Sequence, residues 1–574
     1  MLVLVVSLAI AYTYSEKRHV SIELITSRLP PRGRLVINTI TTIIAIVIFA
    51  ILVWRNTIQF FFFIDTNRVH GIAVEIPASP FMVAVVLGCT LLFLLLVRDF
   101  FSNIAEGLQL RLRSYMWLLM GVVPVLLVVV AIFWMQPALW QLSLPTVGII
   151  GVACSLLLMF IGMPVAFSLI LTSFLFIGHI RGTFTALDIV GSEVFSTASN
   201  YLWAVVAFFV LMGFFALYAR FGEEIYYTAN KWLGHMSGGL GIATIGASTA
   251  FAGIVGDSLS VTTTMGTVAL PEMRRYNYND RLSTGVIAAG ATIGPMIPPS
   301  MGFILYAILT EQSIGKLFIA GILPGLLLAV VFTASIYLRC RFNPELGPPG
   351  TKAIWRERLV SIKFGGPIAF LFLLVIGGIY AGIFTAIEGG GIGAAGAVII
   401  GLAMKRYTWR SLSDALLGAG RVVGMIFLIL VGAMMFTRFI AWCNLADAVR
   451  EFMMGLALPP SVIILLILII FLALGFVMDI MPLILIGVPI FHPVAMALGY
   501  DPVWFTVLLL ITIQVGVITP PFAVILFAIK GLAKDIPIGT IYRGVFPFVM
   551  GTVLVIGIIF AVPPIATWLP SLLY

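Results

Sequence analysis

The sequence predicts an all-α polytopic membrane protein that contains an inverted repeat with two re-entrant helical hairpins and two broken helices. The first observation is composition: 61% of the 574 residues are hydrophobic and 10% are charged, whereas a soluble chain would be about 25% charged. The second is that two distant stretches share unusual glycine, aspartate and proline residues at one fixed offset. The third is the odd number of apolar spans between these stretches, which inverts the second relative to the first.

The N-terminal part, residues 1–113, lies outside the repeat. Its first apolar segment is short for a membrane span, which needs ~20 residues, and it lacks the basic start and small-residue cleavage site of a signal peptide. We therefore expect that the chain is truncated here or that its start lies inside a helix. Residues 19–30 fit an interfacial amphipathic helix or a plain cytoplasmic turn equally well. Residues 114–143 contain an apolar Val-rich stretch and are expected to form a connector helix.

Apolar segments of spanning length recur along the whole chain. They fall at 1–13, 35–53, 79–97, 115–135, 144–161, 163–179, 200–219, 281–310, 317–338, 364–383, 387–404, 422–442, 501–530 and 543–563. Two longer stretches, 238–270 and 459–492, carry a central break and end in a polar turn, so we interpret each as a re-entrant hairpin. With both hairpins returning to the side they enter from, 26 of the 32 lysines and arginines fall in cytoplasmic loops, as the positive-inside rule expects.

The two repeated stretches match residue by residue when 222 is added to each position. Gly253 corresponds to Gly475, Asp257 to Asp479, and Gly294 to Gly516; Pro271 corresponds to Pro493, Pro298 to Pro520 and Pro299 to Pro521. Self-similarity at a fixed offset indicates a repeated structural unit. Paired apolar segments interrupted by glycine and proline are the best sequence indication of a transporter's binding site.

Each break follows a long apolar helix: one spans residues 294–299 and the other spans 516–521. Proline removes a backbone donor and frees a carbonyl one turn earlier, so we expect the carbonyls of residues 294–297 and 516–519 to point into the breaks. Freed carbonyls at a helix C-terminus suit a small cation such as sodium. The half-helices beginning near Ser300 and Phe522 offer positive N-terminal ends to an anionic substrate. The alternative is a pair of plain structural kinks, which the repetition of the pattern disfavours.

Asp257 and Asp479 lie inside apolar runs, where a carboxylate is a functional-site hypothesis by default. Each can either coordinate an ion or cap the helix that follows, and the sequence leaves both alternatives open. Two such aspartates also suggest an intramembrane aspartyl hydrolase. The stretch GIVGD at 253–257 departs from the tight G-x-G-D pattern of that class, so we expect a transporter and no enzyme activity.

Hydroxyl side chains gather after the first hairpin tip but not after the second. They are Ser260, Thr262, Thr263 and Thr264, whereas residues 481–487 at the equivalent place carry none. Such hydroxyls can bond back to helix carbonyls or recognise a polar substrate, and the asymmetry favours substrate recognition at the first tip.

Several other functions are disfavoured by residue patterns. The four cysteines and five histidines show no CxxC or HExxH spacing that would indicate a metal site. The GxxxxGK[ST] motif of an ATPase is missing from the sequence. The net charge of +9 sits in short loops between spans, so it indicates membrane topology and not nucleic-acid binding. We expect the lipid bilayer to be the surroundings of this chain, with no ATPase subunit as a partner.

Specific motifs then resemble those of a known family. The pattern GxxGDSLSxxTTMGxxxLPEM, the IGPMIPPS break, FVMDIMPLILIGVPIFHPVAMALGYDPVWF and GVITPPFAVILFA resemble the large membrane subunit of TRAP (tripartite ATP-independent periplasmic) transporters. The resemblance covers about 144–570. Residues 1–113 resemble the small subunit of the same systems, on the weaker basis of EKRHVSIELITSRLP after an apolar helix, and the small subunit should have one more helix before it.

The resemblance implies an importer of small organic (carboxylate) acids in the inner membrane, driven by a sodium gradient. It implies a periplasmic substrate-binding protein as partner, and an elevator-type transport domain that moves against a scaffold extended by the small subunit. No cofactor is implied other than sodium as the coupling ion. The family often has serine where this chain has Asp257, which leaves open whether a proton replaces a sodium ion.

Site residues follow from the motif match. The first sodium site would comprise Gly253, Gly256, Asp257, Ser258, Gly294, Pro295, Met296 and Ile297. The second would comprise Gly475, Asp479, Gly516, Val517, Ile518 and Thr519. Substrate is expected to contact Ser260, Thr262, Thr263, Pro298, Pro299, Ser300, Pro520 and Pro521. The alternative within transport is a proton-coupled or binding-protein-independent anion carrier on the same fold.

Overall fold

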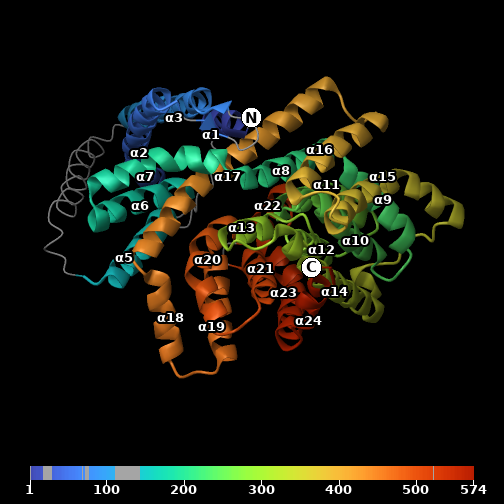
Figure 1. The fold of residues 1–574 in the computed structure, drawn as a ribbon. Coiled ribbons are helices and arrows are strands. Elements are labelled where there is room, and N and C mark those ends of the chain that lie inside the picture. Colours follow the sequence, from blue (N-terminus) through green and yellow to red (C-terminus); the bar gives the residue numbers. More distant parts are fainter. Residues whose placement is uncertain are drawn as a thin grey trace. The chain divides into compact units, whose positions relative to one another are not determined.

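The computed structural model describes residues 2–16, 29–67, 69–70, 76–109, 142–520 and 523–573. These residues are almost entirely helical, which confirms the predicted fold class (Figure 1). One short antiparallel pairing joins β1 (Val69–His70) to β2 (Ile76–Pro77). The chain divides into two compact units, one made of Met1–Trp203 with Gly420–Gly455 and the other of Ala204–Ala419 with Leu456–Tyr574.

The first unit combines the N-terminal part with early helices of the region after the connector. It contains α1 (Leu2–Ser15), α2 (Pro31–Asp65), α3 (Ser79–Gln109), α5 (Leu144–Phe160), α6 (Val165–Arg181), α7 (Thr183–Ser199), the 3-10 turn η3 (Tyr201–Trp203), the C-terminal part of α17 (Trp409–Trp442) and α18 (Leu445–Gly455). Helices α1 and α2 each pack on α3 and on α7. Polar contacts reinforce this packing: Arg55 pairs with Asp188 of α7, and Arg438 of α17 pairs with Glu193 at 2.9 Å.

The second unit holds both repeats. Its first part contains α8 (Ala204–Tyr218), α9 (Phe221–Leu233), α10 (Gly239–Val255), α11 (Ser258–Arg275), α12 (Asp280–Ile293), α13 (Met301–Leu309), α14 (Ile314–Phe342), the 3-10 turn η4 (Pro344–Leu346), α15 (Trp355–Tyr380) and α16 (Ala386–Ala403). Its second part contains α19 (Pro460–Gly475), α20 (Ile480–Ala497), α21 (Pro502–Ile518), α22 (Val524–Leu532), α23 (Ile538–Ala561) and α24 (Pro564–Leu573).

The first halves of the two broken helices, α12 and α21, form the centre of this unit. In α21 every residue from Val503 to Ile518 is buried, and in α12 every residue from Leu282 to Ile293 is buried. Hairpin α10–α11 packs on α12, and hairpin α19–α20 packs on α21. The second half-helices exchange partners, because α13 packs on α20 and α22 packs on α11. This exchange is what a two-fold relation between the repeats produces, as an inverted repeat requires.

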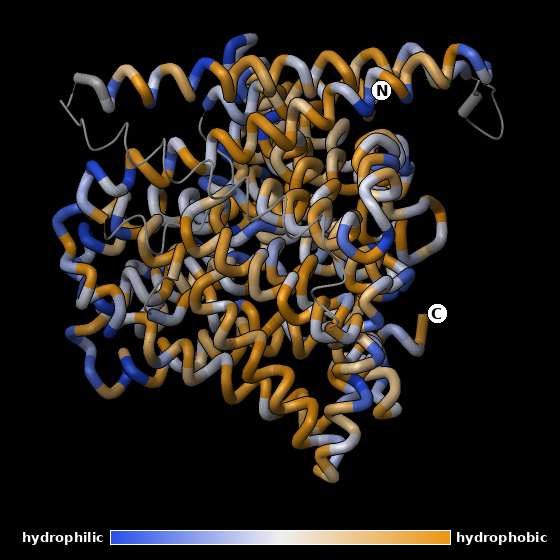
Figure 2. Tube along the Cα trace, turned by 90° about the vertical axis from the view of Figure 1, so that its left-hand side faces the viewer, coloured by the Kyte–Doolittle hydropathy of each residue, from blue (hydrophilic) through white to orange (hydrophobic). Residues whose placement is uncertain are grey.

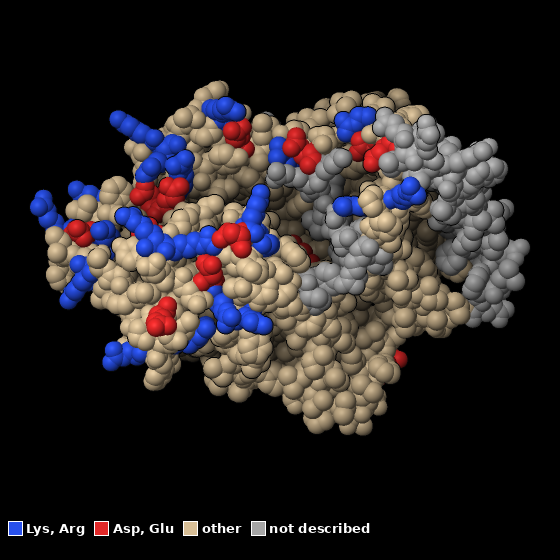
Figure 3. Space-filling model, turned by 180° about the vertical axis from the view of Figure 1, so that it is seen from behind, with Lys and Arg blue, Asp and Glu red and all other residues tan. Residues whose placement is uncertain are grey.

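Length and hydropathy of the helices fit a multi-pass membrane protein. Among the described residues, nine helices are long and apolar enough to cross a membrane. Hydrophobic residues run along most helices, and hydrophilic residues gather largely in the connections (Figure 2). Many large apolar side chains are exposed, including Phe370 and Leu373 on α15, as expected where a helix faces lipid. In the space-filling view charged side chains gather on one part of the face and leave wide areas without them (Figure 3).

Several element predictions need correction. Helix α11 continues through Pro271 to Arg275, five residues beyond the predicted end of the first hairpin, and the turn comes at Asn277 with φ +56°. Four helices that the apolar segments do not predict are present, namely α7, α9, α18 and α24. These helices carry mixed polar and apolar residues or are short, so a search for long apolar runs passes over them. The predicted connector lies outside the described residues from 114 to 141, as do residues 19–28 of the candidate amphipathic helix.

Candidate functional site

The first hairpin tip lies directly against the first helix break. Helix α10 ends at Val255, and Gly256 follows with φ +64°, its backbone N–H donating to the Ala252 carbonyl at 2.8 Å. A Cβ atom on Gly256 would collide with the carbonyl oxygen of Pro299, the second residue of the cis Pro298–Pro299 bond. Both the positive φ and this close approach require glycine here. Glycine at this position therefore allows the backbone of the tip to contact the backbone of the break.

Asp257 sits between this tip and the start of the break. Its side-chain Oδ2 accepts a hydrogen bond from the Ser260 backbone N–H at 2.8 Å, so it caps helix α11. A Cβ atom built on Gly294 would lie 3.4 Å from the Asp257 carbonyl oxygen, which places that carbonyl beside the first break. Capping is therefore one role of Asp257. It leaves the second carboxylate oxygen for another ligand, while the backbone carbonyl already accepts a hydrogen bond from the Val261 N–H at 3.3 Å.

The second tip also packs closely on its broken helix, but through other residues. A Cβ atom on Gly516 would lie 2.6 Å from the carbonyl carbon of Gly475 and 2.7 Å from its Cα. The two glycines thus allow backbone to pack on backbone, which larger residues would prevent. Asp479 precedes α20 in an extended conformation and is partly buried. The Ser258 hydroxyl of the first tip donates to Oε1 of Gln514 on α21 at 3.3 Å, so the first tip reaches the helix on which the second tip packs.

The second break begins later than predicted, which corrects the expectation that carbonyls 516–519 are freed together. Helix α21 runs through Val517 to Ile518, and the Gly516 carbonyl accepts a hydrogen bond from the Thr519 N–H at 3.1 Å. The Thr519 hydroxyl donates to the Val515 carbonyl at 2.5 Å. The reason lies in the sequence: Pro295 ends the first helix early, whereas Val517 at the equivalent position keeps its N–H and continues the helix.

Three residues predicted for the first sodium site face other helices. A Cβ atom on Gly253 would lie 2.5 Å from the Phe372 ring of α15. The carbonyl of Met296 lies against Gly321 of α14, and the Ile297 side chain packs on Gly325 of the same helix. Of the predicted set, the structure brings Gly256, Asp257 and Gly294 together, with Ser258 and Pro295 adjacent in the chain.

The residues predicted to contact substrate divide into two groups. The hydroxyls of Thr262 and Thr263 donate back to helix carbonyls, Thr262 to Ser258 at 2.7 Å and Thr263 to Leu259 at 3.1 Å, so they have the structural role that the sequence left open. Ser300 differs, because it is fully buried at the start of α13 and its hydroxyl has no hydrogen-bond partner in the described chain. Ser260 is partly buried and Pro520 is exposed, and Pro521 lies outside the described residues.

Three polar residues that sequence reasoning missed lie in or beside this region. Gln514 of α21 is fully buried, and its side-chain Oε1 accepts a hydrogen bond from the Ser258 hydroxyl at 3.3 Å. Tyr306 of α13 and His492 of α20 are joined through the phenol oxygen and Nδ1 at 2.6 Å. An amide, a phenol or an imidazole within an apolar segment next to a break was the available signal.

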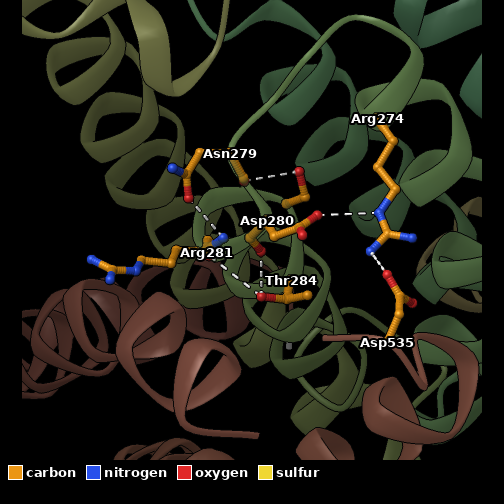
Figure 4. A network of polar contacts seen from close by, with 7 residues as sticks. Arg274, Asn279, Asp280, Arg281, Thr284 and Asp535 are labelled. Atoms are coloured by element: carbon orange, nitrogen blue, oxygen red, sulfur yellow. Dashed lines mark hydrogen bonds and ion pairs between the residues drawn. The ribbon is translucent and has the colours of Figure 1, made fainter. Parts of the chain in front are cut away.

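An ion-pair network lies at the far end of the first repeat from the tip. The Arg274 Nε is 3.1 Å from Asp280 Oδ1, and its terminal nitrogen is 2.5 Å from Asp535 Oδ2 (Figure 4). The network joins the end of α11, the start of α12 and the connection between α22 and α23. The hydrogen bond from Arg274 holds the pKa of the Asp535 carboxyl below its usual value. These contacts tie the second half-helix of one repeat to the hairpin of the other at a surface position.

Comparison with known proteins adds two family matches that together cover most of the chain. A model described as the DctM component of tripartite ATP-independent periplasmic transporters matches residues 152–565, and a model of the DctQ component matches residues 1–106. These ranges agree with the large-subunit and small-subunit resemblances seen in the sequence.

Individual relatives agree with the family models. The sialic acid TRAP transporter large permease protein SiaM of Vibrio cholerae is 32% identical over 420 residues, which are 72% of this chain and 96% of the relative. The C4-dicarboxylate TRAP transporter large permease protein DctM of Pseudomonas aeruginosa is 31% identical over 380 residues, covering 66% of this chain and 88% of the relative. A crystal structure of the Alcanivorax borkumensis YdaH transporter aligns at 14% identity with a TM-score of 0.39, over 62% of this chain and 84% of that chain.

Proposed function

This chain belongs to the tripartite ATP-independent periplasmic (TRAP) transporter family, with the small and large membrane components in one polypeptide, and we propose that it imports a small organic anion by using a sodium gradient. Members of this family are transporters and not enzymes, so the membrane hydrolase alternative is excluded. They are secondary transporters of organic acids that work with a periplasmic substrate-binding protein.

The observation that carries the sodium proposal is the close backbone contact between each hairpin tip and its own broken helix, at the break in the first repeat and in the last turn before it in the second. The backbone oxygens of Pro299 and Asp257 lie at the first contact and that of Gly475 lies at the second. Each tip also carries an aspartate before its second helix, Asp257 or Asp479. Sodium is a hard cation that binds such oxygen ligands, as ion-conducting filters do with backbone carbonyls. We propose one sodium ion at each contact, held by Gly256, Asp257 and Gly294 in the first repeat and by Gly475, Asp479 and the carbonyls near Thr519 in the second.

Coupling follows if the sodium ions and the anion stabilise one closed arrangement of tips and breaks. A ligand shifts an equilibrium only by its differential affinity for the two states. Sodium at the tips would fix the half-helix N-terminus at Ser300, whose dipole favours a negative group. In the proposed elevator mechanism, the loaded tips and breaks then move together against the remaining helices and carry the anion across.

Uptake by proteoliposomes that contain this chain and its partner binding protein tests the proposal. Sialic acid and succinate are suitable probes, because matched relatives are named as transporters of sialic acid and C4-dicarboxylates. Uptake of at least one probe should require an inward sodium gradient and the binding protein. Robust uptake with sodium replaced by choline, or by liposomes containing this chain alone, would falsify it.

A proton-coupled carrier is the second candidate, and the carboxylate at each hairpin tip, Asp257 and Asp479, favours it. Carboxylates at membrane depth serve as proton carriers in transporters, and the resemblance implies that the family often has serine where this chain has Asp257. The two candidates separate in the same vesicles. A pH gradient imposed without sodium drives uptake under proton coupling and has no effect under sodium coupling.

A further inference from the structure

Gln514 is a buried amide with an unused donor at the meeting point of the two repeats. It lies on α21, one turn after Leu510 and two residues before Gly516, and it is fully buried. Its Oε1 accepts from the Ser258 hydroxyl of the opposite repeat at 3.3 Å, whereas its Nε2 has no hydrogen-bond partner among the described residues. A buried amide nitrogen without a hydrogen-bond partner is costly. The unpaired Nε2 of Gln514 therefore indicates that a ligand binds here.

A second unpartnered polar group lies at the same helix crossing. The Ser300 hydroxyl is fully buried and also lacks a partner in the described part of the chain. A Cβ atom on Gly302, in the first turn of α13, would lie 2.9 Å from Leu510, so α13 begins against α21 one turn before Gln514. A Cβ atom on Gly256 would lie 3.5 Å from the Ser300 Cα. Ser258, Ser300 and Gln514 therefore converge from a tip, a break and a helix.

This convergence occurs in only one of the two halves. At an offset of 222, Gln514 corresponds to Thr292, whose hydroxyl donates to the Ala289 carbonyl at 2.7 Å within its own helix. Ser258 corresponds to Ile480, which has no polar side chain. A structural motif of the fold would be expected twice, once in each repeat. A single polar cluster between two otherwise similar halves fits a single ligand bound between them.

We propose that Gln514 is a substrate-binding residue, whose Nε2 donates a hydrogen bond to a carboxylate oxygen of the transported anion. Ser258 is a positioning residue, because its hydroxyl holds the amide with the nitrogen toward the ligand. The Ser300 hydroxyl and the N-terminal end of α13 bind the same negative group, so the carboxylate lies between α13 and α21. This assignment rests on the proposed function and names one anion site per chain, distinct from the two sodium contacts.

The competing role for Gln514 is that of a sodium ligand through its amide oxygen. The two orientations of an amide differ only in which atom is placed toward Ser258. They predict opposite results for a glutamate at this position. An anion site loses its donor and gains a repelling charge, whereas a sodium site keeps an oxygen ligand and gains an attracting charge.

The test compares Gln514→Glu, Gln514→Leu and Ser258→Ala with Thr512→Val as the matched control. Thr512 is buried on the same helix, but its hydroxyl is already bonded to the Leu508 carbonyl at 2.7 Å. Sialic acid and succinate uptake is measured in proteoliposomes with the binding protein, once against substrate concentration and once against sodium concentration. Thermal unfolding of each purified variant shows whether it is folded, and the near-isosteric glutamate variant carries the test if the leucine variant is not.

The assignment predicts that the KM for the anion rises roughly ten- to hundredfold in both Gln514 variants, because each loses a hydrogen bond to a charged group. Ser258→Ala should raise KM by a smaller factor, and Thr512→Val should leave it unchanged. The sodium concentration for half-maximal uptake should change less than twofold in all four. An unchanged KM in folded Gln514→Glu, or a shift in the sodium curve in place of KM, overturns the assignment. Failure of the wild-type protein to transport either anion counts instead against the proposed function, and the assignment falls with it.

Discussion

The two tip–break contacts use the same parts but end their helices differently. In the first repeat Pro295 stops α12 at Ile293, and the break up to Ser300 is fully buried. In the second repeat Val517 lets α21 continue to Ile518, and Pro520 is exposed. Both repeats have a close backbone contact at a glycine, but at positions that are not equivalent, Gly256 against Pro299 in the first and Gly475 against Gly516 in the second. The comparison teaches that close backbone contact at the tip is the shared requirement, whereas the exact position of the break is not.

The largest expected effect is therefore at the glycines of the contacts. Gly256→Ala places a side chain at φ +64° and against the Pro299 carbonyl, and Gly516→Ala places one against the Gly475 backbone. Strain of this kind costs roughly 1–3 kcal/mol, and we expect uptake to fall about tenfold or more. Gly391→Ala on α16 is the control, because a Cβ there meets no atom within 4 Å. Equal uptake by all three variants would show that the contacts do not matter.

The second prediction exchanges the residues that set the two breaks. In Val517→Pro the backbone N–H of residue 517 is lost and α21 should end before Gly516. The free energy of unfolding should fall by about 3 kcal/mol. Pro295→Val should cost less, because it restores a donor at the end of a buried helix. The thermal unfolding midpoint in detergent measures both. If Val517→Pro is as stable as the wild type, a proline is tolerated at this position, and Val517 does not explain why the second break comes later.

The third prediction separates the two roles of Asp257. Asn retains the cap on α11, so Asp257→Asn should change stability by only a few tenths of a kcal/mol, whereas Asp257→Ala should cost about 1 kcal/mol. If the carboxylate also binds sodium, Asp257→Asn alone should raise the sodium concentration needed for half-maximal uptake. If Asp257→Asn leaves both the sodium dependence of uptake and the stability unchanged, capping of α11 is the only role of Asp257, and its charge is not needed.

The smallest effect concerns the surface network of Arg274. Because Arg274 lowers the pKa of Asp535, the pair stabilises the folded state when the carboxyl is ionised in both folded and unfolded chains. That contribution is present at pH 7 and is lost as the pH falls through the lowered pKa. Arg274→Gln should therefore lower the unfolding midpoint slightly at neutral pH. The difference in unfolding midpoint between Arg274→Gln and wild type should shrink in acid. A difference that grows in acid would show that the pair does not stabilise the folded state through the ionised carboxyl of Asp535.

The main architecture could be predicted from the sequence because the residues that indicate it act on the backbone at their own positions. Glycine and proline at the tips and breaks restrict the backbone wherever they occur, and their repetition at one offset revealed both halves. Gly253 and Met296, which the motif match assigned to a sodium site, lie against α15 and α14, and the rotation of a helix, which decides such contacts, is not specified by a motif. Gln514 was missed because its partner, Ser258, is 256 positions away in the chain. Contacts across that separation follow from tertiary packing, which a repeat pattern alone does not specify.

The central claim is that the tips and breaks couple sodium to an organic anion. Proteoliposomes with the partner binding protein and an imposed inward gradient of the transported anion, but equal sodium on both sides, test it directly. Radioactive sodium should accumulate inside against its own concentration, and Gly256→Ala should abolish that accumulation. Anion entry without any movement of sodium would contradict the account.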